Sequence, residues 1–515
     1  MSGVELGFAL KDRTLANGKV IRAVAGFDAT VSAPKSLSVL WALTGDPGFA
    51  EAHDVAVQAV LSHLERFGST TRIRSNGGRL HPDSQGLIVA GFRQTTSRAD
   101  DPQLHTHLVI SSKVQTGDGR WLALDARILK RYQHTLGGLY QSVLRAELTD
   151  RYGVGFGEIV KGQAEIAGVP AELLALFSKR TVQVDDALAM KMAEFYQREG
   201  RDPTGWEKAA LTREAAADTR VHKTSRSVDE LRPGWLEDAA DIGVTPESLL
   251  LAVHEAGLGL ETVAGVTVND VLDVLSAGGS AWHREDVIRA VCDLQRPLSG
   301  VDGERWAAMI EQAADGFIEQ HVDLDPVLGV SGRVRDSDGR SEWIEPVAAH
   351  ITSEVILTQE EAILTWAYDA HSSGPDPSIN DQGQGLDVLQ RDAAAAVAGQ
   401  DRLVLVIGPA GTGKRTMLSA AVTDLGVQGR DVYGVSPTAK AARPLERETG
   451  MPCDTVAKLD VSRGGCECGD ATVEVGGEIE ECGAAVTGVR GCVHRGEGVY
   501  VELCEASACR TARGV

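Results

Sequence analysis

The chain lacks a long apolar run, since no stretch of its 515 residues approaches the roughly 20 apolar residues that span a bilayer. Its first residues also lack the basic and apolar segments of a signal peptide. Even so, 43% of the residues are hydrophobic, which allows large buried cores, and the length is typical of about three domains. We therefore expect a soluble, cytoplasmic protein with several domains.

Cysteine is scarce through most of the chain, and Cys292 is the only one before residue 450. This usage is expected of a protein kept in a reducing compartment. The last 53 residues differ, because they contain six cysteines, eleven glycines and one leucine, a composition that does not readily build a core. Two interpretations are open for residues 462–515. One is a zinc site, although the cysteine spacings match no common zinc module. The other, which we favour, is an unfolded tail produced by a frameshift.

Acidic residues outnumber basic ones, and the net charge of -22 at first argues against a nucleic-acid partner. The excess is uneven, however. Residues 1–150 carry 17 Lys and Arg against 14 Asp and Glu, whereas the remainder carries 34 against 59. A slightly basic first region can bind DNA locally on an acidic protein, although ordinary variation along a chain produces such a difference as well.

The apolar pattern divides the chain into regions. Residues 1–225 mix the patterns of strands and helices, with strands expected at Gly26–Ala33, Gly86–Gln94 and Leu104–Val114, and helices at Asp46–Phe67 and Thr135–Gly153. Residues 226–385 are largely acidic and helix-prone, and they end in a stretch rich in turn-forming residues. We expect them to form a helical linker region before an α/β domain at residues 386–461.

Two histidines, His105 and His107, stand one residue apart in the third expected strand. Alternate side chains of a strand share a face, so both imidazoles point the same way, which suits a metal ion. Alone the pattern is weak, because histidines that are merely hydrogen-bonded on a sheet face also produce it.

Four ordered stretches add weight to the histidine pattern. They are FDATVSAPKSLSVLWAL (Phe27–Leu43), FRQTTSRADDPQLHTHLV (Phe92–Val109), DGRWLALDARILKRYQHTLGGLYQSVLRAEL (Asp118–Leu148) and FSKRT (Phe177–Thr181). Together they resemble the relaxase domain of TrwC/TraI-type conjugative relaxase-helicases, the MobF class of HUH endonucleases. The resemblance implies an α/β fold: an antiparallel sheet with helices, then the helical linker, then a partial P-loop domain similar to RecD-like superfamily 1 helicases.

The resemblance also implies a chemistry. In this family three histidines hold a divalent metal that polarises the scissile phosphate of single-stranded DNA at a transfer origin, and a tyrosine attacks the phosphorus. Carried over to this sequence, His105 and His107 match two of the ligands. Gln94 stands where the third histidine belongs, and its amide oxygen suits Mg²⁺ or Mn²⁺. Other relaxosome or conjugation proteins are implied partners.

Further polar residues match positions near these motifs. Asp28 corresponds to the aspartate of the family's D-x-T-x-SAPKS motif and is expected either to accept the tyrosine proton or to orient a metal-binding histidine. On sequence alone, an aspartate before a turn is more often structural. Five basic residues are expected to contact DNA phosphates, although each could equally be an ordinary surface charge. They are Lys35, Arg72, Arg74, Arg93 and Arg98.

The tyrosine nucleophile is missing from its expected place. The family carries its catalytic tyrosines before the aspartate motif, yet none of the 27 residues before Asp28 is tyrosine. The first tyrosines, Tyr132 and Tyr140, lie in a segment expected to be helical, and neither is expected to be the nucleophile. Two interpretations are open. In the first, the true start lies upstream, and the chain is truncated there as well as in its helicase part. In the second, the chain is an inactive DNA-binding remnant of a relaxase.

A glycine-rich loop follows the apolar stretch Leu403–Ile407, which has the pattern of a buried strand. Such a loop directs backbone N–H groups at ATP phosphates. Arg415 stands where a Ser or Thr should hold Mg²⁺, and no later strand ends in acidic residues, so ATP binding is expected to be weak and helicase activity absent. An ATP-binding protein of unrelated role is a third hypothesis. The residues expected to contact ATP are Gly408, Pro409, Ala410, Gly411, Thr412, Gly413, Lys414, Arg415 and Thr416.

Overall fold

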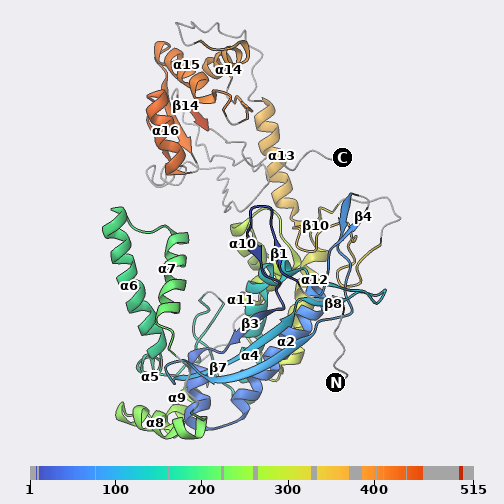
Figure 1. Cartoon of the computed structure of the whole chain (residues 1–515), viewed down its shortest axis with the longest axis vertical. Helices are drawn as coiled ribbons and strands as arrows, with labels where there is room; N and C mark the ends of the chain where they lie inside the picture. Colours follow the sequence, from blue (N-terminus) through green and yellow to red (C-terminus); the bar gives the residue numbers. More distant parts are fainter. Residues whose placement is uncertain are drawn as a thin grey trace. The chain divides into compact units, whose positions relative to one another are not determined.

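The computed structural model forms two compact units, one of Met1–Ser276 with Ala281–Thr352 and one of Ala277–Ser280 with Ser353–Val515. Figure 1 labels their helices and strands. Among the described residues, none of the helices combines the length and the apolarity needed to cross a membrane. The structure describes residues 7, 11–75, 77–160, 162–221, 226–258, 265–325, 333–369, 385–401, 403–409, 411–436, 438–455 and 498–502.

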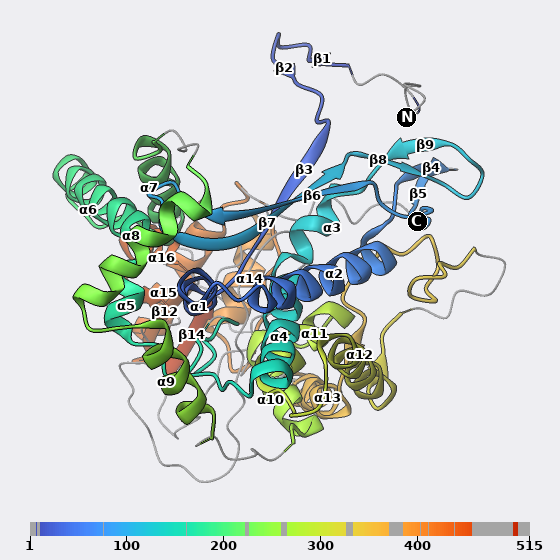
Figure 2. The same ribbon diagram turned by 90° about the horizontal axis from the view of Figure 1, so that it is seen from below.

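The first unit is built on three antiparallel strands in the order β3-β7-β6, which are Gly26–Ser32, Pro102–Ser111 and Val89–Thr96. Along β7 every second side chain is buried, from Leu104 to Ile110, so one face of the sheet is covered. Helices α1 (Lys35–Thr44), α2 (Gly48–Gly68) and α4 (Gln133–Tyr152) lie on that side (Figure 2). The three expected strands and the two expected helices are thus confirmed, and among the described residues no helix packs over the other face near Phe92 and Val109, which are exposed.

Further elements surround this centre. Helices α6 (Lys179–Glu199) and α7 (Gly205–Asp218) form a hairpin that is held by the Lys191 ammonium, which lies 3.0 Å from Glu214 Oε1 and 2.7 Å from Asp218 Oδ2. The remaining strands are β1 (Arg13–Thr14), β2 (Val20–Ile21), β4 (Ile73–Ser75), β5 (Gly78–Leu80), β8 (Lys113–Gln115), β9 (Trp121–Ala123), β10 (Val322–Asp323) and β11 (Ile351–Thr352). The remaining helices are α3 (Ala126–Arg131), α5 (Ala171–Leu176), α6 (Lys179–Glu199), α7 (Gly205–Asp218), α8 (Val228–Asp241), α9 (Pro246–Leu258), α10 (Val268–Gly278), α11 (Arg284–Leu294) and α12 (Gly303–Glu319).

Most of the region expected to be a helical linker packs into the first unit. The Trp306 indole N–H of α12 donates to Ser142 Oγ of α4 at 2.9 Å, and the Arg145 guanidinium of α4 donates to the carbonyl of Cys292 in α11 at 2.8 Å. Trp306 and Cys292 are both buried. The region is helical as expected, but the division between the units falls after Thr352 rather than at residue 225. The composition of residues 226–385 predicts helices, but it does not predict which hydrophobic core those helices pack against.

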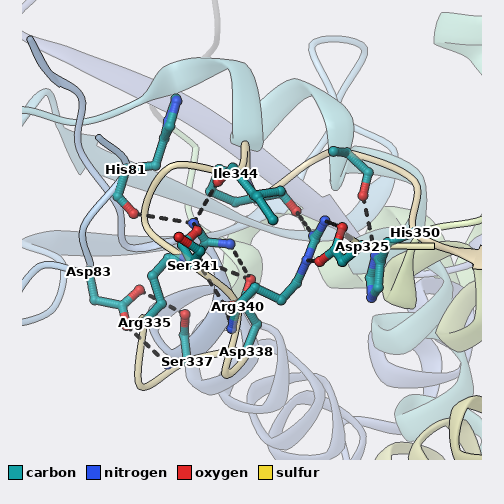
Figure 3. A network of polar contacts seen from close by, with 12 residues as sticks. His81, Asp83, Asp325, Arg335, Ser337, Asp338, Arg340, Ser341, Ile344 and His350 are labelled. Carbon is teal, nitrogen blue, oxygen red and sulfur yellow. Dashed lines mark hydrogen bonds and ion pairs between the residues drawn. The ribbon is translucent and has the colours of Figure 1, made fainter. Parts of the chain in front are cut away.

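A loop after β10 is fixed to the β4–β5 hairpin by a polar network (Figure 3). The Arg335 side chain is fully buried, pairs with Asp338 at 2.8 Å, and donates to the carbonyls of Ser341 at 3.0 Å and Ile344 at 2.7 Å. Ser337 Oγ donates to Asp83 Oδ1, which follows the hairpin, at 2.7 Å. Residues 333–350 therefore belong structurally to the first unit.

A buried histidine links α2 to the helices of the same region. The His63 ring lies 2.9 Å from Glu285 Oε2 and 3.0 Å from Glu311 Oε1. Burial alone would lower the pKa of His63, but the charges and hydrogen bonds of Glu285 and Glu311 outweigh it and raise the pKa to about 9. The protonated ring therefore ties α2 to α11 and α12.

This pairing predicts a pH dependence of stability. Because the pKa of His63 is higher in the folded state, its contribution is fully present below pH ~6.5, the ordinary histidine pKa, and is lost as the pH rises through about 9. We expect the free energy of unfolding of the first unit to fall across this window in urea titrations. In His63→Gln the fall should shrink, and an unchanged pH profile in that variant would contradict the assignment.

The second unit contains three parallel strands in the order β13-β12-β14, which are Cys453–Thr455, Asp431–Ser436 and Gly498–Glu502. Its core includes Leu418 of α15 and Leu445 of α16. β14 lies in the tail expected to be unfolded, whereas the six tail cysteines lie outside the described residues. The helices are α13 (Glu354–Asp369), α14 (Val388–Ala398), α15 (Lys414–Val427) and α16 (Ala439–Thr449).

One local prediction for the second unit is wrong. Residues 403–407 form no strand, and Leu405 and Ile407 are 76% and 83% exposed. Val406, between them, packs against the core, so the segment keeps the side-chain alternation of a strand. A parallel strand depends on hydrogen bonds from its neighbours and on cover over both faces. Among the described residues, residues 403–407 have no neighbouring strand that bonds to them and no cover over both faces. Their apolar pattern alone therefore predicts a strand that does not form.

Candidate functional site

The open face of the β3-β7-β6 sheet brings the predicted metal ligands together. In an antiparallel sheet, residues directly opposite each other point to the same face. Gln94 of β6 lies directly opposite His105 of β7, and His107 is the next β7 residue on that face. The two imidazole rings lie edge to face with their centres 5.3 Å apart. Residues from two strands that are distant in sequence thus form one group.

Hydrogen bonds fix the chemical form of both histidines. His107 Nδ1 lies 2.9 and 3.0 Å from the carboxylate oxygens of Asp28 and 3.1 Å from Thr30 Oγ1. His105 Nδ1 lies 2.8 Å from the carbonyl oxygen of Gln103. Carbonyl and ionised carboxylate oxygens only accept, so each Nδ1 carries the proton and each Nε2 carries the lone pair that a metal requires. A carboxylate behind a metal-binding histidine orients the ring and makes it more basic.

The three side chains could act as the protein ligands of a divalent metal ion. Their donor atoms are two imidazole nitrogens and the amide oxygen of Gln94. Within the described parts of the chain, no three His, Cys, Asp or Glu side chains converge in the way of a metal site. The site therefore depends on the amide oxygen, which suits hard ions such as Mg²⁺ and Mn²⁺.

A cleft of about 620 Å³ adjoins this group and gathers positive charge. Five basic side chains line it, whereas Asp101 is the only acidic one among its described lining residues. Asp101 is buried, and this burial raises the pKa of its carboxyl group. A polyanion is the ligand that such a cleft favours, in a chain whose net charge is -22. The basic residues are Lys35, Arg98, Arg180, Arg213 and Arg220.

The structure brings only some of the predicted DNA contacts to the cleft. Lys35 and Arg98 line it, with Lys35 Nζ donating to the carbonyl of Pro102 at 2.9 Å. Burial lowers the pKa of Lys35, although Asp101 and Glu165 oppose the shift. Three other predicted residues are not among the lining residues. Arg93 pairs with Asp54 of α2 on the covered side, Arg72 lies 3.4 Å from Asp125, and Arg74 is exposed in the β4–β5 hairpin.

Three lining arginines were not predicted. Arg180 stands in the FSKRT stretch, where the resemblance could have indicated it, and its guanidinium also donates to the carbonyls of Ala216 and Thr219 at 2.8 and 2.6 Å. Arg213 in α7 and Arg220 just after it belong to no motif. Arg213 and Arg220 reach the cleft because the C-terminal half of α7 and the residues just after it border the cleft.

Neither of the two tyrosines nearest the family motifs lines the cleft. Tyr140 is buried, and its hydroxyl lies 2.6 Å from Nδ1 of His53, whose Nε2 lies 2.8 Å from Thr106 Oγ1. Thr106 points to the covered face, opposite to His105 and His107. Burial raises the pKa of Tyr140 and also that of Tyr132. Their positions agree with the expectation that neither is the nucleophile.

The glycine loop of the second unit leads into α15, which begins at Lys414 after the left-handed Gly413. Lys414 Nζ donates to the carbonyls of Gly408 and Pro409 at 2.5 and 2.9 Å. Arg415 pairs with Glu448 of α16 at 2.9 Å. Of the other predicted ATP contacts, Ala410 lies outside the described residues, and Gly411, Thr412 and Thr416 lie in the loop or at the start of α15.

Comparison with known proteins gives the family. Residues 3–242 match the profile of the TrwC relaxase, and residues 385–486 match that of an AAA domain. Residues 3–242 thus belong to the TrwC relaxase family. The predicted resemblance is confirmed, and so is its order of a relaxase part before a nucleotide-binding type of domain. The AAA match continues past Ser462, into the segment for which a frameshift was expected.

Several relatives of this TrwC-type chain are conjugation proteins. Two multifunctional conjugation proteins TraI, from Escherichia coli and its strain K12, are 25% and 28% identical over 449 residues, which is 82% of this chain and 23% of each relative. The chain thus spans about a quarter of their length. A solved structure titled conjugative relaxase TrwC in complex with oriT DNA, copper-bound, is 32% identical, covers 44% of this chain and 73% of its own, and has a TM-score of 0.37. A metal-bound TrwC–oriT DNA structure is 29% identical, covers 48% and 79%, and has a TM-score of 0.39.

Proposed function

We propose that this chain acts on single-stranded DNA at a transfer origin as a relaxase-like conjugation protein, which takes part in metal-dependent nicking and strand transfer. One observation carries the proposal. Gln94, His105 and His107 lie together on one face of the sheet, beside a cleft rich in arginine, and Asp28 is hydrogen-bonded to His107. The match of residues 3–242 to the TrwC relaxase and the likeness to the conjugation proteins TraI support it.

In this proposal each group has a separate task. Gln94, His105 and His107 would hold Mg²⁺ or Mn²⁺, which supplies Lewis-acid polarisation of a phosphate when bound. The Asp28 carboxylate accepts the hydrogen bond from His107 Nδ1–H, so the ring keeps its Nε2 lone pair toward the site. The cleft arginines and Lys35 bind the flanking phosphates and position the strand.

The alternative function is a DNA-binding remnant that does not nick. Incubation of the purified chain with Mn²⁺ and a labelled single-stranded transfer-origin oligonucleotide separates the two. A covalent protein–DNA adduct on a denaturing gel means that the chain nicks DNA with a nucleophile of its own. Binding without an adduct means that the chain alone is the non-catalytic form. Absence of preferential single-strand binding would overturn both.

The cleft arginines give a quantitative test of DNA binding. For single strands, the slope of log K against log salt changes by ~0.7 for each phosphate contact. We expect the double variant Arg213→Ala, Arg220→Ala to bind the oligonucleotide more weakly and to have a slope less steep by about 1.4, measured by fluorescence anisotropy. The matched control is Arg72→Ala, Arg74→Ala, whose residues lie outside the cleft. If the affinity and the salt slope change more in the control than in the cleft variant, the DNA binds outside the cleft.

Gln94 gives a test of the metal site. We expect Gln94→His to raise the affinity for Zn²⁺ and Ni²⁺, because imidazole suits these ions better than an amide oxygen, and to raise the affinity for Mg²⁺ much less. Isothermal titration of both proteins with each metal checks this. An unchanged metal preference would show that residue 94 is not a ligand.

We propose a second, weaker activity for the second unit, which is the binding of a nucleotide phosphate by the Gly408–Thr416 loop. The AAA match and the start of α15 at Lys414 favour it. Arg415, in place of a Ser or Thr hydroxyl, is expected to make the binding depend little on Mg²⁺. Titration with a fluorescent ATP analogue, with and without Mg²⁺, tests this, and binding that requires Mg²⁺ would contradict it.

A further inference from the structure

An exposed aromatic side chain stands beside the histidine pair on the open sheet face. Phe92 of β6 lies directly opposite His107, so its ring shares the face of the predicted metal ligands. Cβ atoms of such directly opposed residues are about 4.5–5.5 Å apart. Phe92 is 55% exposed, and Val109, the next β7 residue on this face, is 42% exposed. The two form an apolar patch, here called the Phe92 patch.

The Phe92 patch and the cationic cleft lie at opposite ends of the ligand group. Gln94, His105 and His107 line the cleft together with the basic residues, whereas Phe92 and Val109 are not among its lining residues. Along β6 the order on this face is therefore Phe92 and then Gln94, and of these two Gln94 lines the cleft. A ligand that extends from the cleft past Gln94, His105 and His107 therefore reaches the Phe92 patch next.

A phenylalanine ring can bind neither a phosphate nor a metal ion, so it serves the site in another way. Leu104 and Leu108 of β7 point to the covered face and are buried there, and Phe92 does not join them. Among the described residues its ring makes no aromatic contact. What a strand of DNA offers in addition to phosphates is a flat base with an apolar face, and bases stack on exposed aromatic rings in a manner that tolerates any sequence.

We propose that Phe92 is the stacking platform for one nucleobase of the single-stranded DNA, next to the phosphate at Gln94, His105 and His107, with Val109 extending the platform. This inference rests on the proposed function, since it assumes that single-stranded DNA occupies the site. It adds a contact to a base, whereas the cleft contacts only the backbone. Phe92 would thus position the strand rather than take part in bond making.

The test compares two probes that share a backbone but differ in bases. These are a fluorescein-labelled 20-nucleotide oligothymidine and an abasic oligonucleotide of the same length, both measured by anisotropy with Mn²⁺. We expect Phe92→Ala to weaken oligothymidine binding about tenfold and to leave abasic binding unchanged, while Phe92→Trp keeps the preference for bases. The matched control is Val160→Ala, another exposed apolar residue of the first unit that is not among the cleft residues.

The outcomes separate this inference from the proposed function. If the wild-type chain binds neither probe, the proposed function fails. If it binds oligothymidine and Phe92→Ala binds both probes as the wild type does, only the stacking role is overturned. Equal weakening on both probes would also overturn it, because the ring would then support the fold or the backbone site. A change in oligomeric state of Phe92→Ala in light scattering, without a change in DNA binding, would assign the patch to a second copy of the chain instead.

Discussion

Asp28→Asn is expected to lower the affinity of the first unit for Mn²⁺ by about ten- to a hundredfold, the usual cost of losing a carboxylate behind a metal-binding histidine. Asp28 accepts a hydrogen bond from the Nδ1–H of His107 at 2.9 Å and so keeps the Nε2 lone pair available for the metal. Asparagine can occupy the same space, but it has no charge to hold the ring in this form. Isothermal titration with Mn²⁺ measures the change.

Two variants show whether the loss comes from the contact itself. Thr30→Val removes the hydroxyl that lies 3.1 Å from the same nitrogen and removes no charge, so a smaller loss is expected. Asp54→Asn removes an acidic group that pairs with Arg93 on the covered side, and the affinity should stay as in the wild type. If Asp54→Asn weakens Mn²⁺ binding as much as Asp28→Asn does, the effect is one of net charge. The orienting role of Asp28 would then be wrong.

The sequence predicts the parts of this site that depend on local periodicity. Alternation along one strand places His105 and His107 on one face, and the structure agrees. The same rule places Arg93 on the face opposite to its neighbour Gln94. The prediction of Arg93 as a DNA contact therefore conflicted with the strand pattern itself, and the pairing of Arg93 with Asp54 reflects that pattern.

What depends on register and on distant packing could not be read from local patterns. Gln94 faces His105, and Asp28 reaches His107, only through the particular alignment of β6 and β3 with β7. The resemblance to relaxases supplied these pairings, since periodicity does not fix which residues of two strands are opposed. It did not supply Arg213, because a helix without a motif gives no signal of the cleft that it borders. The same reasoning applies to residues 333–350, whose charged residues look like those of a solvated linker.

Arg335→Met is expected to lower the free energy of unfolding of the first unit by about 3–5 kcal/mol, the cost of breaking a buried ion pair by removing one partner. The Arg335 side chain is completely buried and pairs with Asp338. Its removal leaves that carboxylate without its cation and leaves the carbonyl of Ile344 without the guanidinium N–H that it accepts from. Urea unfolding followed by tryptophan fluorescence measures the loss, and Trp343 lies within the affected loop.

Arg305→Met is the matched control, because the Arg305 side chain is 75% exposed and its pair with Asp302, at 3.5 Å, lies on the surface. Surface pairs contribute about 0–1 kcal/mol, so little change is expected. Single-stranded DNA binding by folded Arg335→Met should match the wild type, since none of its contacts lies in the cleft. Equal stability losses in the two variants would show that the loop is only loosely attached. Residues 333–350 would then be a linker after all, and the first unit would end before them.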